Sequence, residues 1–403
     1  MGSFLRAGYP FRLRLFRIAG RTTPPMSTPI PLPSTNLSAF SDEISRSKVA
    51  YTSSVRCPMP VPLFDGQQTD AFARGLELYN VVFSTDRRSI WLPAMTLSMF
   101  TIENATVLMG TAVGGMVLDS QNRRIVEPSC FCTYDLARME ASLSGLEVEE
   151  ELDEAFVGFD APYANYYHWL LYGLSRTKIA CERLPPSVKL IIPDVPRLLD
   201  REQFAYSPET FEETLRGYDF GNRLVRMGPG AIRIKKLHFM WHEPTMPELY
   251  LTIYEAYRTF DDIEAPFRPD LPRRFYVTRE KSVNARISPD EQHAIDQLLA
   301  ATGIEKIFLE HLDFRSQVAL FRQAELIVAP HGAGLANLVF ARPGTKVLEL
   351  NRLLDGQNHL RNCFYLIAAQ RKLIYGSFDL SHDDLTAERL MHAIRNLEQN
   401  SRI

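Results

Sequence analysis

The strongest constraint on the fold is a regular alternation of apolar runs and amphipathic segments after residue 272. The apolar runs lie at 273–279, 305–310, 325–329, 346–350 and 373–378. The segments between them have helical spacing, and a parallel strand needs such a crossover before the next strand can pair with it. Strand and helix alternate in steps of about 25 residues, which predicts a doubly wound parallel sheet.

Local signals support the helices of this half. Ser288 and Glu291 form a capping box with Pro289 at the first helical position, and Gly303 follows the expected helix end. Further helices are expected at 314–324, 334–341, 357–371 and 383–399. Ligands of such sheets bind at the carboxyl ends of the strands. The residues in that position are 279–286, 310–313, 330–337 and 349–352.

The first half of the chain is less regular. Residues 51–145 carry short apolar runs broken by polar turns, which indicates a mostly β region. The acidic segment 147–156 is expected to be solvated surface. Residues 163–183 have helical spacing, with His168 and Tyr172 on one face. Strands at 187–194 and 232–241 and a helix at 209–217 are expected to follow.

The proline-rich segment 260–272 is the expected linker. We therefore predict a tail at 1–45, a first domain at 46–262 and a second domain at 270–403. A length of 403 residues is sufficient for two domains, and a composition of 45% hydrophobic and 23% charged residues is typical of globular proteins.

Bulk properties narrow the functional classes. The net charge of −3 gives no reason to expect a nucleic-acid partner. No window approaches 18 consecutive apolar residues, so a membrane span is not expected. The five cysteines show no zinc spacing and are interpreted as reduced thiols. A cytoplasmic location is expected, with peripheral contact at the inner membrane face as a further option.

The N-terminus differs from the rest. Residues 1–25 hold five arginines and no acid, and a segment rich in Pro, Ser and Thr follows. The arginines interrupt the apolar core that a signal peptide needs. Three interpretations remain open: a disordered tail or a start placed too early with Met26 as the true start, a basic segment touching an anionic membrane, and a transit peptide.

A basic loop follows the first strand of the second half. It carries Arg279, Lys281 and Arg286 against Glu280. Guanidinium groups and a helix N-terminus both favour phosphate oxygens, so the loop suits a phosphate or diphosphate. A solvated basic loop is the alternative.

The most distinctive stretch is His331, Gly332, Ala333 and Gly334, directly after a buried strand. The two glycines are expected to take positive φ and to let the backbone approach a ligand. The N–H groups of Ala333, Gly334 and Leu335 are then available to a phosphate. His331 has three possible roles: hydrogen-bond donor, metal ligand or base. The alternative is a plain strand-to-helix turn with a packed imidazole.

Other motif classes are missing from the sequence. There is no Gly-x-Ser-x-Gly elbow of a serine hydrolase, no Gly-x-Gly-x-x-Gly dinucleotide loop and no P-loop. Glu349 ends the next strand, where a carboxylate can accept from a ribose diol. The alternative for Glu349 is a salt bridge to Lys346 or Arg352. No Asp-x-Asp occurs near these loops, so no divalent metal is expected.

Three ordered motifs resemble glycosyltransferase family 61 and its relatives among bacterial capsular-polysaccharide proteins. They are NYYHWLLYGLSR at 165–176, YVTREKSVNARISPDE at 276–291, and the long segment at 312–350 that contains His-Gly-Ala-Gly. The resemblance implies a GT-B arrangement, with two Rossmann-like domains facing a cleft after a β-rich N-terminal part. It also implies inverting, metal-independent transfer from a nucleotide sugar, such as a UDP-sugar, to a glycan or other hydroxyl acceptor, without a cofactor.

The resemblance assigns roles to matching positions. The donor-binding set comprises Arg279, Lys281, Asn284, Arg286, His331, Gly332, Ala333, Gly334, Leu335, Asn337 and Glu349. The acceptor-side set in the first domain comprises Asn165 and Tyr166, next to His168. One departure matters: the family commonly has Asp or Glu four residues after that histidine, where this chain has Tyr172.

An inverting transfer needs a base for the acceptor hydroxyl. The candidate catalytic residues are His168, whose unperturbed pKa of about 6.5 suits neutral pH, Asp160 before the helix, and Tyr172 itself. The alternative function is a nucleotide-sugar-binding scaffold without turnover in a polysaccharide assembly complex.

Overall fold

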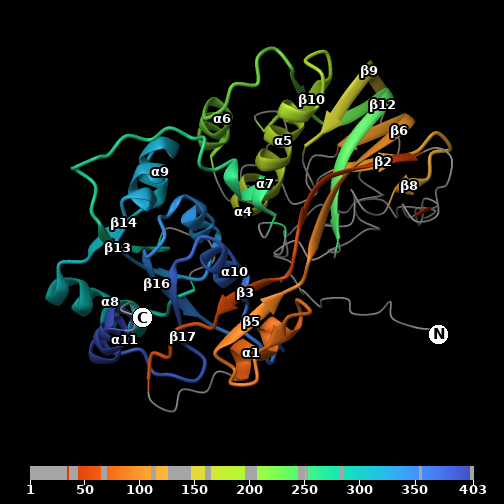
Figure 1. Ribbon diagram of the computed structural model, residues 1–403. Helices are drawn as coiled ribbons and strands as arrows, with labels where there is room; N and C mark the ends of the chain where they lie inside the picture. Colours follow the sequence, from red (N-terminus) through yellow and green to blue (C-terminus); the bar gives the residue numbers. More distant parts are fainter. Residues whose placement is uncertain are drawn as a thin grey trace, which may run out of the picture.

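The protein is a mixed α/β structure in which two large sheets stand side by side, as Figure 1 shows. The computed structural model describes residues 34–35, 44–64, 70–109, 115–125, 147–158, 165–195, 207–243, 250, 253–280, 286–353 and 356–399. The mixed α/β class predicted from the sequence is confirmed.

The second half forms a five-stranded parallel sheet in the order β14-β13-β15-β16-β17. Its strands are β13 Arg274–Val277, β14 Glu305–Ile307, β15 Leu326–Pro330, β16 Lys346–Asn351 and β17 Ile374–Asp379. Four of the five strands begin and end within two residues of their predicted bounds, and β14 begins at its predicted position but ends three residues early. The order 2-1-3-4-5 is that of a doubly wound sheet with a switch point between β13 and β15.

Helices cover both faces of this sheet. They are α8 Pro289–Thr302, α9 Phe314–Arg322, α10 Cys363–Gln370, α11 Ala387–Gln399, and the 3₁₀ helices η4 Leu309–His311 and η5 Ala333–Phe340. Alternate strand residues point to opposite faces. Ile327 and Ala329 therefore pack with η5 and α10, whereas Leu326 and Val328 pack with α8 and α11.

The capping box is confirmed: Ser288 accepts from the Glu291 N–H, and Gly303 ends α8 in the left-handed conformation. The helix expected at 357–371 begins only at Cys363, with Asn362 as its N-cap. The six preceding residues therefore form a loop rather than two turns of helix, and this loop carries Arg361 to the carboxyl edge of the sheet.

The first half is built on a nine-stranded mixed sheet, in the order β1-β8-β7-β6-β12-β9-β10-β11 with β2 also paired to β6. The strands are β1 Ser34–Thr35, β2 Ile44–Thr52, β6 Met95–Met109, β7 Gly115–Leu118, β8 Arg124–Ile125, β9 Val148–Val157, β10 Lys189–Pro193, β11 Leu224–Met227 and β12 Gly230–Glu243. Pairing is parallel from β12 through β9 and β10 to β11, and antiparallel between β12 and β6.

The acidic segment 147–156, expected to be solvated surface, forms the strand β9 between β12 and β10. Its first half is exposed and its last three residues are buried. The acidic side chains are accommodated because β12 presents lysines beside them: Lys235 lies 2.7 Å from Asp153, and Lys236 lies 2.8 Å from Glu154. Cross-strand pairs of opposite charge stabilise a sheet, so an acidic run here is compatible with a strand.

The helix expected at 163–183 runs without a break from Tyr166 to Arg183, but it changes helix type along its length. It comprises α4 Tyr166–His168, a π-helical turn η2 Trp169–Leu174, and α5 Ser175–Arg183. Two shorter helices, α6 Pro208–Arg216 and α7 Tyr254–Arg258, complete this half. π-helical turns are rare and often occur at functional sites. The turn lies directly after His168.

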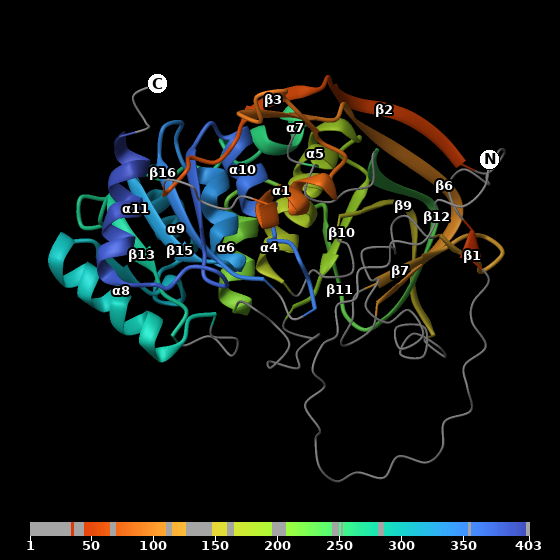
Figure 2. The same ribbon diagram turned by 90° about the horizontal axis from the view of Figure 1, so that it is seen from below.

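A small sheet and one helix from the first half pack against the second half (Figures 1 and 2). They are β3 Val55–Pro58, β4 Val82–Phe83, β5 Ser89–Leu92 and α1 Asp70–Glu77. The N–H of Val61 donates to the Tyr375 carbonyl at 2.8 Å, and the Asn362 amide donates to the Phe72 carbonyl at 2.8 Å. The prediction that 51–145 is mostly β missed helix α1. This helix is hydrogen-bonded through Phe72 to Asn362, at the end of the loop that carries Arg361.

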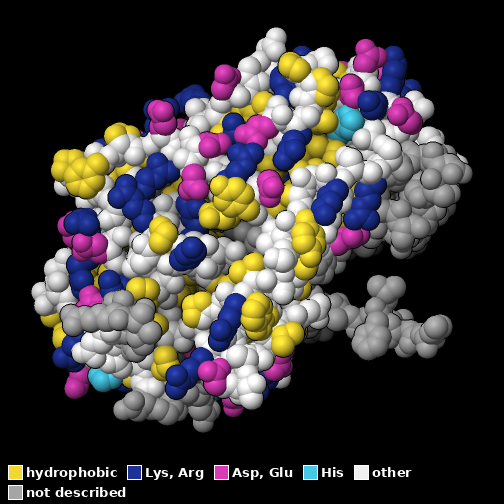
Figure 3. Space-filling model, in the orientation of Figure 1, with side chains coloured by type: hydrophobic (Ala, Val, Ile, Leu, Met, Phe, Trp, Pro, Cys, Tyr) yellow, Lys and Arg dark blue, Asp and Glu magenta, His cyan; other side chains and the backbone are white. Residues whose placement is uncertain are grey.

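No helix in the described ranges is both long enough and apolar enough to cross a bilayer. Of the five cysteines, Cys57, Cys181 and Cys363 are described, and none of these three forms a disulfide bond with another described cysteine. Basic and acidic side chains are interspersed over the face shown in Figure 3.

We expect Gly75→Ala to destabilise the protein by about 1–3 kcal/mol, the usual range for overpacking. A Cβ at Gly75 would lie 2.1 Å from the Leu360 carbonyl oxygen, a backbone atom that cannot swing away. Thermal unfolding measures the effect. Gly217→Ala is the matched control, because its nearest contact is 3.2 Å and its φ is helical; equal effects of the two changes would show that α1 does not pack tightly on the loop.

Candidate active site

A buried hydrogen-bond network joins the ends of three neighbouring parallel strands. His331 follows β15, and its Nδ1 lies 2.5 Å from Oε1 of Glu349 on β16. The hydroxyl of Tyr375 on β17 donates to the other oxygen of Glu349. The Phe364 ring of α10 lies against the His331 imidazole, with the ring centroids 4.8 Å apart. The sequence pointed to His331 and Glu349 but missed Tyr375 and Phe364.

The role expected for Glu349 is wrong in this structure. Its side chain is fully buried, and its two oxygens are bonded to His331 and Tyr375 rather than being open to a ribose diol. The alternative partners Lys346 and Arg352 are not its partners either. The carboxylate instead fixes the His331 ring, as an orienting acid does for a catalytic or ligand-binding histidine.

The glycines of the His-Gly-Ala-Gly turn are explained by space rather than by positive φ. Gly332 has φ 164° and ψ 170°, which is extended backbone. A Cβ there would lie 1.7 Å from Nη1 of Arg279, and a Cβ at Gly334 would lie 2.9 Å from Leu309. The expectation of positive φ is therefore wrong. The glycine does allow another group to come close to the backbone, because the Arg279 guanidinium packs on Gly332.

One further expectation for this turn changes. The N–H of Leu335 donates to the Gly332 carbonyl at 2.9 Å, so it closes the first turn of η5 instead of being available to a phosphate. Nη1 of Arg279 donates to the His331 carbonyl at 2.7 Å. The basic loop after β13 is thus attached directly to the turn after β15.

Three arginines gather at this edge: Arg279 and Arg286 flank the loop after β13, and Arg361 precedes α10. Burial lowers the pKa of all three, and for Arg361 it lowers the pKa to about 10, with the charge of Arg286 as the next cause. The Nε atoms of Arg286 and Arg361 are buried and have no hydrogen-bond partner among the described residues. Buried guanidinium nitrogens require an acceptor, so this cluster fits an anion with several oxygens.

Arg361 is a further functional candidate that sequence reasoning missed. It was assigned to the interior of a helix at 357–371, where an arginine is usually solvated. One sequence signal could have revealed it: Arg361 lies two residues before the apolar run that begins at Cys363 and forms the first turns of α10.

Burial is also the main influence on His331. It lowers the pKa of the imidazole to about 4; the Glu349 carboxylate opposes this shift, and Arg361 and Arg286 add to it. The ring is therefore neutral at pH 7. With Nδ1 directed at Glu349, the other nitrogen, Nε2, has no partner among the described residues.

The motif at 165–176 lies against the His-Gly-Ala-Gly segment. The Tyr166 hydroxyl donates to Oδ1 of Asn337 at 2.7 Å, and the Asn337 amide donates to Gln317 at 3.0 Å. The Tyr167 and Phe364 rings make an edge contact at 5.6 Å. The structure thus joins a residue of the acceptor-side set to one of the donor-binding set, and both are buried rather than open to a ligand.

The candidate bases are less favourable than expected. Burial, with the charge of Arg176, lowers the pKa of His168 to about 4, so the expectation of an unperturbed pKa is wrong. Its Nδ1 is buried without a partner among the described residues. Tyr172 is fully buried, with its hydroxyl 3.3 Å from that of Tyr167. Asn165 caps α4 by accepting from the Tyr167 N–H at 2.9 Å.

Three candidate residues, Asp160, Lys281 and Asn284, lie outside the described residues. Within the described ranges, no group of three or more His, Cys, Asp or Glu side chains could hold a metal ion.

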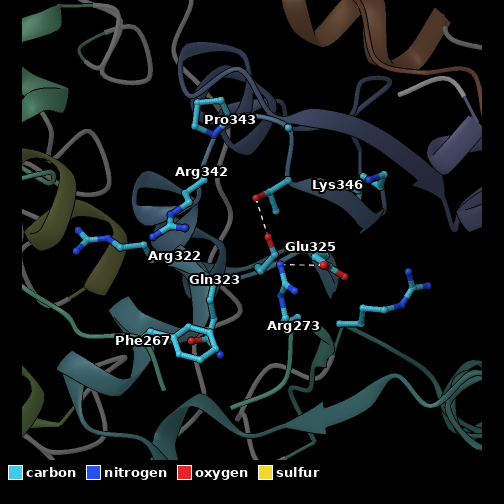
Figure 4. A pocket seen from close by; sticks show the side chains of 12 residues that line it. Phe267, Arg273, Arg322, Gln323, Glu325, Arg342, Pro343 and Lys346 are labelled. Atoms are coloured by element: carbon cyan, nitrogen blue, oxygen red, sulfur yellow. Dashed lines mark hydrogen bonds and ion pairs between the residues drawn. The ribbon is translucent and has the colours of Figure 1, made fainter. Parts of the chain in front are cut away.

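A separate pocket of about 560 Å³ lies at the opposite edge of the same sheet (Figure 4). Arg273 and Glu325 line it and pair at 2.9 Å, and Arg342 and Lys346 lie near them. It is at the amino ends of β13, β15 and β16, whereas ligands of such sheets bind at the carboxyl ends.

Residues 166–348 match the family described as Glycosyltransferase 61. This segment starts one residue after Asn165 and ends one residue before Glu349. It supports the resemblance drawn from the three motifs. Arg361 and Tyr375 lie beyond the matched segment, although the structure brings them to the same edge.

Two curated glycosyltransferases are similar to part of this chain. EGF domain-specific O-linked N-acetylglucosamine transferase of Drosophila melanogaster is 25% identical over 129 residues, which is 30% of this chain and 25% of that protein. Beta-1,2-xylosyltransferase RCN11 of Oryza sativa subsp. japonica is 34% identical over 70 residues, which is 17% of this chain and 12% of that protein. The chain thus matches a quarter or less of either relative's length. Together with the family match, these relatives support a glycosyltransferase.

Acidification is expected to destabilise the protein through His168, a partly buried histidine whose pKa is lowered. The pKa of His168 is about 4 when folded and about 6.5 when unfolded, so below pH 6.5 the unfolded state binds a proton that the folded state does not. The contribution of His168 to the free energy of unfolding is therefore fully present above about pH 6.5 and is lost as the pH falls toward 4. Urea unfolding between pH 7 and 4.5 measures this. His168→Gln is expected to reduce the change of the unfolding free energy with pH. His293→Gln, at an exposed site, is expected to leave that pH dependence unchanged. Equal pH dependence in the two variants would contradict the role given to His168.

Proposed function

We propose that the protein is an inverting, metal-independent glycosyltransferase that moves a sugar from a nucleotide-diphosphate sugar, with UDP-sugar as the first choice, to a hydroxyl acceptor. The observation that carries this is the cluster of Arg279, Arg286 and Arg361 beside the His-Gly-Ala-Gly turn. A diphosphate is an anion with several oxygens, and guanidinium groups bind such oxygens in forked pairs. The cluster neutralises the leaving diphosphate as the bond to the sugar breaks.

The remaining assignments follow from this placement. In the GT-B arrangement that we propose, the five-stranded sheet binds the donor and the first half holds the acceptor. His168 is the candidate base; its neutral imidazole can accept the acceptor proton, but its low pKa makes it a weak base. Synthesis of a surface polysaccharide, in the cytoplasm and near a membrane face, is part of the proposal.

The test is calorimetric titration with UDP. Arg286→Ala is expected to weaken binding about 10–100-fold, the range for a lost charge-assisted hydrogen bond. Arg273→Ala is the matched control, because it removes an arginine from the opposite edge of the same sheet, where it pairs with Glu325. Unchanged affinity in Arg286→Ala, or equal losses in both variants, would refute the donor site.

Gly332→Ala is expected to reduce UDP binding by moving the Arg279 guanidinium out of its place in the cluster. A Cβ would displace the guanidinium, which is 1.7 Å from it, and would leave the fold intact because the end of an arginine can move. UDP affinity should fall as far as in Arg279→Ala, and the double variant should be no weaker than either single variant. Additive losses would show that the two residues act independently.

The second candidate function is a nucleotide-sugar-binding scaffold. The buried position of Tyr172 and the low pKa of His168 favour it, because neither group is a strong base. A transfer assay against a panel of UDP-sugars and sugar acceptors separates the two functions: binding without turnover under all conditions supports the scaffold.

A further inference from the structure

His331 is held in a position where a proton and a diphosphate could be bound together. Its Nδ1 is 2.5 Å from the Glu349 carboxylate, which also accepts from Tyr375. The ring is fixed against Phe364, and the His331 carbonyl accepts from Arg279. Among the described residues, Nε2 has no partner. A neutral ring bonded to a carboxylate through Nδ1–H presents Nε2 as an acceptor, whereas an anion requires a donor there.

We infer that the nucleotide diphosphate is bound together with one proton, which His331 carries on Nε2 between Glu349 and the diphosphate oxygens. This rests on the proposed function, because it assigns a diphosphate to the arginine cluster. It goes beyond that function by making donor binding dependent on protonation of a buried histidine, for which the sequence left the roles of hydrogen-bond donor, metal ligand and base open.

The charges that face His331 explain why the proton arrives only with the ligand. Arg279 and Arg286 face it from the loop after β13, and Arg361 from the loop before α10; Glu349 faces it from β16. Tyr375 on β17 is held neutral by burial, and its pKa is raised well above the ordinary value. In the free protein, burial and the charges of Arg361 and Arg286 outweigh the carboxylate, and the imidazole is neutral.

A bound diphosphate reverses this balance. It places negative charge against the same arginines, so their repulsion of a proton on His331 is cancelled while the attraction of Glu349 remains. The diphosphate also supplies an acceptor for Nε2–H. Both effects favour the imidazolium, and linkage then requires that lowering the pH tightens binding.

The experiment is calorimetric titration of the full chain with UDP-glucose at pH 7.5 in HEPES and in Tris, two phosphate-free buffers with different ionisation enthalpies. The diphosphate diester of this probe does not titrate near neutrality, so proton uptake comes from the protein. The expected result is uptake of about half to one proton per ligand, with affinity rising as much as about tenfold per unit fall in pH.

Two variants identify the carrier of the proton. His331→Asn keeps an amide donor for Glu349, so it preserves the buried pair, but it cannot titrate; uptake should disappear while weakened binding remains. His382→Asn is the matched control, because His382 pairs with Asp379 at 2.7 Å but is half exposed and outside the network; its uptake should equal that of the wild type. Wild-type binding with the same enthalpy in both buffers, or uptake that persists in His331→Asn, overturns the inference alone. If neither UDP-glucose nor UDP binds, the proposed function fails as well.

Discussion

Glu349→Ala is expected to lower the free energy of unfolding by about 2–5 kcal/mol. The substitution leaves the Nδ1–H of His331 and the hydroxyl of Tyr375 buried without an acceptor, and each such group carries a desolvation penalty. Glu349→Gln should cost less, because its amide oxygen still accepts from one of the two donors. Denaturation by urea, followed by circular dichroism, measures the difference.

The control for this prediction is Glu325→Ala. Glu325 also pairs with a basic residue of the same sheet, Arg273, but both side chains are about half exposed. Exposed pairs contribute about 0–1 kcal/mol. If the two alanine variants unfold at the same urea concentration, Glu349 is not the centre of a buried network.

Arg361→Ala is expected to separate binding from stability. UDP affinity should fall about 10–100-fold, because a charge-assisted contact to the diphosphate is lost. The free protein should keep or gain stability, because the change removes a buried cation that has no ion pair among the described residues. Calorimetry and thermal unfolding of the same samples measure the two quantities.

A variant that loses UDP affinity but keeps or gains stability indicates a ligand site whose charged residues lower the stability of the free protein. A purely structural arginine would lose stability and leave affinity unchanged. Arg361→Lys is the conservative variant: it keeps the charge but not the forked donors, so its affinity should lie between those of the wild type and Arg361→Ala.

The second half of the fold could be predicted from the sequence because its signals are local. Buried parallel strands are continuous apolar runs, and the capping box at Ser288 and the left-handed Gly303 mark the ends of α8. The first half was harder, because strand β9 is stabilised by pairing with lysines about 80 residues away in sequence. No local pattern records that pairing.

The site was predictable by position but not by role. The rule that ligands bind at the carboxyl ends of strands pointed to His331 and Glu349, and the structure brings these two side chains together. Their roles depended on Tyr375, which comes from another strand and uses one of the carboxylate oxygens. Arg361 depended on where α10 begins, and helix boundaries are the least certain feature of a sequence. The low pKa of His168 likewise depends on burial that only tertiary packing creates.

The central claim is that the carboxyl edge of the five-stranded sheet binds a nucleotide diphosphate through its arginines. The most direct measurement is the ratio of affinities for UDP and uridine in the wild type and in Arg361→Ala, by calorimetry at one salt concentration. The account predicts that UDP binds at least about 100-fold more tightly than uridine in the wild type, and that the ratio falls about 10–100-fold in the variant. Equal affinities for UDP and uridine in the wild type would contradict it, because the diphosphate would then contribute nothing to binding.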